Sequence, residues 1–116
     1  MTWTTQPRSK RGPLPAITAG AGPKIMMIHG VGLRAEAWGG QMAELSAIGA
    51  VAAVDMPGHG QSARITGGSQ LADFTDVFAQ AIEEPTIVIG HSFGAMIALD
   101  LAVRYPEKAR AVAALN

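Results

Sequence analysis

The chain has 116 residues, no cysteine, and nine basic and nine acidic residues, so its formal net charge is zero. With 48% apolar and 16% charged residues, the composition excludes a disordered chain, and the lack of cysteine excludes a disulfide scaffold. Zero net charge argues against a nucleic-acid partner, and no charge-free stretch reaches the ~20 residues of a membrane-spanning helix. We expect a soluble, cytoplasmic protein with no membrane partner.

The first half of the chain predicts three strands and one helix. Short apolar runs at 14–18, 24–28 and 50–54 are typical of strands, and the last two, which lack polar alternation, of strands buried on both faces. Between them, Trp38, Met42, Leu45 and Ile48 recur at helical spacing and predict a helix over 35–48.

The second half predicts a helix, a strand, a helix and a strand. Ser69 is placed to cap a helix whose apolar stripe runs from Leu71 to Ile82, and Pro85 is expected to end it. Residues 86–89 predict the next strand. A helix over 92–105 is apolar almost all round, which is typical of a helix buried on most sides, and 109–115 predict a last strand.

This alternation predicts the α/β class, with a mostly parallel sheet and helices flanking it. In such sheets, ligands bind beyond the carboxyl ends of the strands. Three glycine-containing polar loops, at 29–32, 55–62 and 90–94, each follow a predicted strand. We therefore expect these loops to meet at one edge of the sheet.

The loop at 90–94 reads Gly-His-Ser-Phe-Gly and fits the pattern G-x-S-x-G between a strand and a helix. A turn this tight forces its central residue, Ser92, into strained backbone angles and presents the hydroxyl at a helix N-terminus. The free N–H groups and partial positive charge there favour a developing oxyanion, and the N–H of Phe93 is the natural first donor. The alternative without a catalytic role is a glycine-rich turn in which Ser92 only caps the helix.

Taken together, the three loops resemble the α/β-hydrolase superfamily in its serine-hydrolase branch. Residues 29–32 (His-Gly-Val-Gly) look like its oxyanion loop, residues 55–62 like its D-x-x-G-x-G-x-S loop, and residues 90–94 like its nucleophile elbow. The resemblance implies Ser92 as nucleophile and the N–H groups of Val31 and Phe93 as oxyanion hole. No carboxylate and histidine cluster has the spacing of metal ligands, so we expect no metal, and we expect no cofactor. The residues that it implies as shaping the loops are His29, Gly30, Gly32, Gly90, His91 and Gly94. Asp55 then organises its loop, and Trp38 lies near the substrate entrance.

The resemblance also implies an incomplete catalytic set. In this family the acid and the histidine follow the nucleophile, but after Ser92 the chain has no histidine and only Asp100 and Glu107 as acids. We therefore interpret 1–116 as the N-terminal part of a single hydrolase domain, with a truncated fold and with 1–11 as a flexible segment or first edge strand. Such a chain is expected to be inactive alone and to self-associate through the exposed edge of its last strand.

The implied activity is hydrolysis of a small-molecule ester, thioester or lactone through an acyl-enzyme on Ser92. Two alternatives stay open. A hydrolase-like protein could bind a ligand or partner without catalysis. Alternatively, residues 30–35 fit G-x-G-x-x-A, with Asp55 at the end of the next strand, which approximates a dinucleotide-binding fingerprint. Asp100 has a simpler interpretation, as an ion pair with Arg104 one helical turn later.

Overall fold

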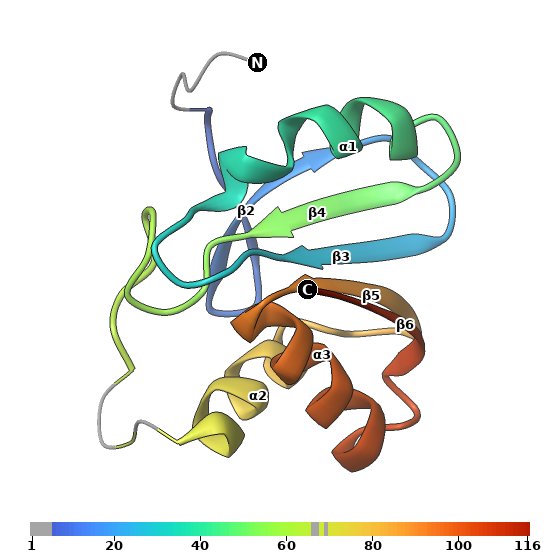
Figure 1. Ribbon diagram of the computed structural model, residues 1–116. Coiled ribbons are helices and arrows are strands. Elements are labelled where there is room, and N and C mark those ends of the chain that lie inside the picture. Colours follow the sequence, from blue (N-terminus) through green and yellow to red (C-terminus); the bar gives the residue numbers. More distant parts are fainter. Residues whose placement is uncertain (1–5, 66–67, 69) are drawn as a thin grey trace.

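The computed structural model describes residues 6–65, 68 and 70–116. A single six-stranded sheet lies between α1 on one face and α2 and α3 on the other (Figure 1). The strands are β1 (Ser9–Arg11), β2 (Leu14–Ala19), β3 (Lys24–Ile28), β4 (Ala50–Val54), β5 (Thr86–His91) and β6 (Ala109–Leu115). The helical segments are the 3₁₀ turn η1 (Ala35–Trp38) and the helices α1 (Gly39–Leu45), α2 (Leu71–Gln80) and α3 (Phe93–Arg104). The predicted α/β class with a mostly parallel sheet is confirmed.

The strand order is β1-β2-β4-β3-β5-β6. β3, β4, β5 and β6 run parallel, whereas β1 and β2 are antiparallel to their neighbours. Because β3 lies between β4 and β5, the loops that follow these three strands emerge side by side at one edge of the sheet. The loop after β3 is the middle one of the three.

The core lies on both faces of the sheet, which explains the continuous apolar runs. Along β3, Ile25 and Met27 pack in the cluster on the α1 side, whereas Met26 and Ile28 pack in the cluster with α2 and α3. The residues of β4 alternate in the same way. Strands buried on both faces leave no polar side for solvent, so their sequence shows no alternation.

The predicted single helix over 35–48 is wrong. The segment begins as η1, and α1 starts only at Gly39 and ends at Leu45. After Leu45 the chain turns toward β4, and the N–H groups of Ile48 and Gly49 both donate to Leu45 O at 3.0 Å. Trp38 and Met42 are buried as expected, but Ile48 lies beyond the helix and is 68% exposed.

Helix α2 begins and ends differently from the prediction. Gln70 is its N-cap and forms a capping box with Asp73, while Ser69 lies outside the described residues. The helix ends at Gln80, five residues before Pro85. Its apolar stripe packs on the sheet as expected, with Phe78 fully buried.

Helix α3 is buried on one face only, so the prediction of burial on most sides is wrong for this chain. Ile97, Ala98 and Leu101 have no exposed surface, but Met96 and Leu99 are each 52% exposed and Val103 is 78% exposed. These three residues follow one another at helical spacing on the side away from the sheet. The neighbouring strand β6 pairs with β5 on one side only and forms an edge of the sheet. No helix in the described part of the chain is long and apolar enough to cross a membrane.

Candidate active site

Ser92 lies at the sharp turn between β5 and α3, where it is the N-cap of the helix. Its backbone angles are φ 59° and ψ −119°, and it is the one non-glycine residue of the described chain with a positive φ. A Cβ at Gly90 would collide with the backbone of Gly94, and a Cβ at Gly94 would collide with the carbonyl oxygen of Ile28. The turn therefore requires glycine at both ends of the motif.

The surrounding backbone holds this strained conformation. The N–H of Ser92 donates to Leu115 O of β6 at 2.9 Å, and the N–H of Ala95 donates to Ser92 O at 2.9 Å. Phe93, the next residue, packs edge-to-face on Phe74 of α2. Strain at a non-glycine residue persists only where the neighbouring structure fixes it, and such positions cluster at functional sites.

The loop after β3 approaches the elbow closely. A Cβ added to Gly30 would lie 3.3 Å from the Cβ of Ser92 and 3.2 Å from Nδ1 of His91. Within the described residues, the N–H groups of Val31 and Phe93 donate no hydrogen bond. The fold thus brings Ser92 and the loops that carry both expected oxyanion donors together, while the catalytic roles of all these residues stay predictions.

His29 organises the loop after β3. Its ring is buried, Nε2 accepts the N–H of Met56 at 3.1 Å, and Nδ1 lies 2.8 Å from Gly30 O. Because Nε2 accepts, Nδ1 carries the proton and donates it to Gly30 O. This bond fixes the plane of the Gly30–Val31 peptide, whose other end is the N–H of Val31. Burial lowers the pKa of His29 and so favours the neutral ring.

Asp55 organises the loop after β4. Its buried carboxylate accepts the N–H groups of Ala35 at 2.9 Å and Gln61 at 3.0 Å, and also Nε of Arg8 at 2.8 Å. Burial acts to raise the pKa of Asp55, but the hydrogen bonds from Arg8 and the two N–H groups hold it below its ordinary value. The carboxylate is ionised, and both of its oxygens already accept hydrogen bonds from Arg8 and the two N–H groups. This leaves no acceptor for the ribose hydroxyl that the dinucleotide alternative requires.

The sequence interpretation missed the partner of Asp55. That partner is Arg8, in the segment before β1, which also forms a bidentate ion pair with Glu36 of η1. These two side chains are only 5% and 3% exposed. The one signal in the sequence was the position of the acids: Glu36 lies among apolar residues, and Asp55 directly follows an apolar strand.

The three histidines make no hydrogen bond to Ser92 in the part of the chain that the structure describes. Both ring nitrogens of His29 and of His59 bond to the backbone of the two loops. Among the described residues, no hydrogen bond joins the Ser92 hydroxyl to a histidine. Asp100 bonds to Arg104 at 3.1 Å, as the helical spacing predicted.

A pocket of about 340 Å³ opens beside the elbow. Its walls include Leu33 of the loop after β3, His91 at the end of β5, Leu115 at the end of β6, and Trp38. In the described chain, Nε1 of Trp38 is the one buried side-chain nitrogen or oxygen that lacks a hydrogen-bond partner. Trp38 therefore lies next to the candidate site, where the resemblance placed it.

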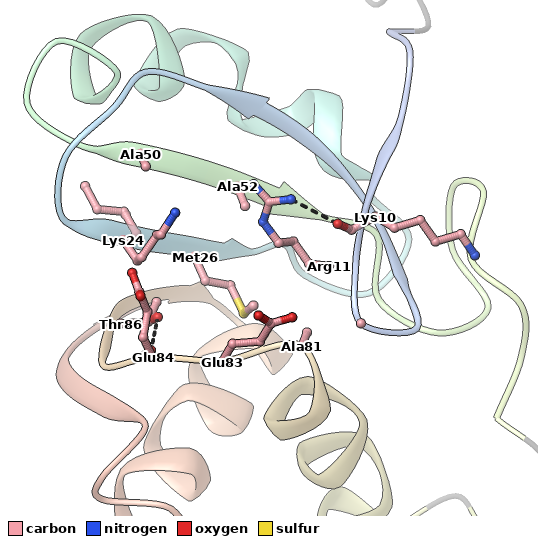
Figure 2. A pocket seen from close by; sticks show the side chains of 12 residues that line it. Lys10, Arg11, Lys24, Met26, Ala50, Ala52, Ala81, Glu83, Glu84 and Thr86 are labelled. Atoms are coloured by element: carbon pink, nitrogen blue, oxygen red, sulfur yellow. Dashed lines mark hydrogen bonds between the residues drawn. The ribbon is translucent and has the colours of Figure 1, made fainter.

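A second pocket, of about 360 Å³, lies at the opposite edge of the sheet. It is lined by the first residues of three parallel strands, Lys24, Ala50 and Thr86, and by charged side chains of both signs (Figure 2). Amino ends of parallel strands lie opposite the edge that carries Ser92, so this pocket takes no part in the candidate site.

Comparison with known proteins agrees with this geometry. Residues 25–115 match a family model described as alpha/beta hydrolase family. Over 101 residues the chain is 39% identical to (E)-2-((N-methylformamido)methylene)succinate hydrolase of Acinetobacter baylyi, covering 84% of this chain and 38% of that protein. Over 89 residues it is 37% identical to pimeloyl-[acyl-carrier protein] methyl ester esterase of Neisseria meningitidis, covering 77% of this chain and 34% of that protein.

Among solved structures, E-2-(acetamidomethylene)succinate hydrolase superimposes with a TM-score of 0.84 at 30% sequence identity. The match covers 94% of this chain and 43% of that structure. The chain thus spans less than half the length of the relatives it matches. The chain belongs to the alpha/beta hydrolase family.

Proposed function

We propose that the chain carries the nucleophile and the oxyanion hole of a serine hydrolase that acts on a carboxylic ester, thioester or lactone. The main support for this proposal is the backbone of Ser92, which is held at φ 59° at the N-terminus of α3. The N–H groups of Val31 and Phe93 nearby donate no hydrogen bond within the described residues. Hydrolase relatives, one of them named as a methyl ester esterase, support the reaction class.

In the proposed reaction, Oγ of Ser92 attacks the carbonyl carbon and gives up its proton to a general base. The carbonyl oxygen gains the negative charge and accepts hydrogen bonds from the N–H groups of Val31 and Phe93, assisted by the positive end of α3. The bond to the alkoxy or thiol leaving group then breaks, and the base returns the proton to that group. Water attacks the resulting acyl-serine in the same way, which releases the acid and restores Ser92.

We further propose that the general base and its acid partner belong to a longer protein of which residues 1–116 are the N-terminal part. Ser92 has no histidine partner within the described residues, and the matched relatives are more than twice as long as the aligned segment. Without a base a serine hydroxyl is a weak nucleophile, so the 116-residue chain alone should be nearly inactive.

The test combines a mass with a labelling experiment. The intact mass of the protein from its own host should be at least about twice the 12.0 kDa of this chain. That protein should react with a fluorophosphonate probe at Ser92, Ser92→Ala should abolish labelling, and Ser62→Ala in the loop after β4 should leave it unchanged. A host protein of 12.0 kDa that is soluble and unlabelled would contradict the proposal and favour a binding protein without catalysis.

A further inference from the structure

The loop after β3 lies between two others. On one side Gly30 touches the elbow, as the 3.3 Å between its added Cβ and the Cβ of Ser92 shows. On the other side lies the loop after β4, which carries His59. The geometry of the expected oxyanion donor, Val31, therefore depends on what holds this middle loop in place.

Packing does not hold the tip of this loop. Val31 is 67% exposed, and a Cβ added to Gly32 would meet no atom within 4 Å. Gly32 also has a φ of +86°, a conformation open chiefly to glycine. Within the loop, the N–H of Leu33 donates to Gly30 O at 3.2 Å and closes the tip as a turn. The position of this exposed turn then depends on hydrogen bonds that tie it to the neighbouring loops.

His59 supplies a hydrogen bond at the tip. The N–H of Gly32 donates to Nε2 of His59 at 3.0 Å, so Nε2 carries no proton. Nδ1 then carries the proton and donates it to Pro57 O at 3.1 Å. The backbone of His59 is fixed in a turn, because its N–H donates to Met56 O and its carbonyl accepts the N–H of Ser62. The ring is thus neutral, oriented and anchored before it meets Gly32.

We propose that His59 is a positioning residue of the oxyanion hole, which holds the N–H of Gly32 through Nε2 of its ring. The two peptide planes that flank Val31 are then held from both sides of the turn, the first at Gly30 O by His29 and the N–H of Leu33, and the second at the N–H of Gly32 by His59. Fixing both planes fixes the direction of the Val31 N–H. This inference rests on the proposed function, in which Val31 is a donor to the oxyanion.

The charged surroundings of His59 are defined. The ring of His29 lies 5.3 Å away between centroids, and the charge of a protonated His59 acts to lower the pKa of His29. Behind His29 lie Asp55 and Arg8, which carry opposite charges and are paired at 2.8 Å. A protonated Nε2 would point an N–H at the N–H of Gly32, and that contact cannot form a hydrogen bond.

The experiment measures amide hydrogen exchange at Gly32 by mass spectrometry with fragmentation of the peptide, at low protein concentration. Three chains are compared with the wild type: His59→Leu, which lacks an acceptor, His59→Gln, whose carbonyl oxygen accepts at any pH, and Gln61→Ala as a control in the same loop. Near pH 8 the Leu variant should exchange about tenfold faster than the wild type, as expected for the loss of one hydrogen bond, while Gln and the control stay protected.

The protection of Gly32 in His59→Gln tests the hydrogen bond itself, because a purely structural histidine would not show this rescue. Equal protection of Gly32 in the wild type and His59→Leu, or exchange in His59→Gln as fast as in His59→Leu, would overturn the proposal. Neither outcome depends on Ser92, whose labelling tests the proposed function separately.

Discussion

Arg8 and Glu36 face each other with both guanidinium NH groups 2.7 Å from the two carboxylate oxygens, although 28 residues separate them in the chain. Nε of the same guanidinium bonds to Asp55 at 2.8 Å. One buried cation therefore joins the segment before β1, the turn η1 and the end of β4. Removing one member of a buried ion pair leaves the other charge uncompensated, which usually costs more than the pair contributes.

Glu36→Gln should destabilise the protein and weaken its acid sensitivity. The hydrogen bond to Arg8 lowers the pKa of Glu36 from 4.5 to about 2 in the folded state. Between these values the unfolded chain binds more protons, so the stability that Glu36 confers is complete above about pH 4.5 and lost as the pH falls to about 2. This shift corresponds to about 3 kcal/mol of stability at pH 7.

The free energy of unfolding, measured in urea from pH 7 down to pH 2, checks this prediction. Glu36→Gln should lower it at pH 7 and flatten its decline below about pH 4.5, leaving the part due to Asp55. Glu44→Gln, on the exposed side of α1, is the matched control and should change neither. Coinciding curves for the wild type and Glu36→Gln would show that the ion pair contributes nothing.

Ser92→Gly should stabilise the fold while removing the nucleophile. A non-glycine residue at φ 59° and ψ −119° stores about 1–3 kcal/mol of strain, and glycine adopts this conformation without a Cβ clash. We expect a gain of about 1 kcal/mol in the free energy of unfolding, reduced by the greater entropy of the unfolded glycine chain.

The matched control is Ser46→Gly at the C-cap of α1, where φ is an ordinary −63°. There the substitution should cost up to about 1 kcal/mol for two reasons. The unfolded chain gains entropy, and the hydrogen bond from the Ser46 hydroxyl to Ala43 O is lost. Thermal unfolding of both variants gives the comparison. A loss of stability in Ser92→Gly equal to that in Ser46→Gly would show that the elbow is not strained.

Gly90→Ala should disrupt the elbow. An added Cβ would collide with the backbone of Gly94 and Ala95, which cannot move without breaking the turn, and we expect a loss of about 3 kcal/mol or more. Gly40→Ala is the control, since a Cβ at Gly40, inside α1, meets no atom within 4 Å. That change should stabilise by about 0.5–1 kcal/mol through helix propensity. Similar stabilities of the two variants would contradict the close packing at Gly90.

The sequence predicted the parallel sheet and the elbow because each depends on residues that are close together in the chain. An apolar run such as 24–28 reports burial on two faces, and glycines four residues apart around Ser92 report a turn without room for Cβ atoms. The sequence did not predict the ion pair of Arg8 with Glu36 or the bond of Gly32 to His59. Both join segments 27 or 28 residues apart, and only the order of strands in the sheet brings them together. The prediction for 35–48 failed because helical spacing of apolar residues does not report where the chain turns toward the next strand, which happens after Leu45.

Self-association through β6 is the last prediction. This strand pairs with β5 alone, its outer edge offers unpaired backbone groups, and Ala111, Ala113 and Leu115 are exposed on it. An apolar, unpaired edge is a template for a strand of another copy. Light scattering coupled to size-exclusion chromatography should therefore show a mass that rises with concentration. Ala113→Lys should shift the chain toward monomer, because a charge on the edge strand disfavours pairing, whereas Ala43→Lys on the exposed side of α1 should not. A monodisperse monomer that unfolds cooperatively at every concentration would contradict the prediction.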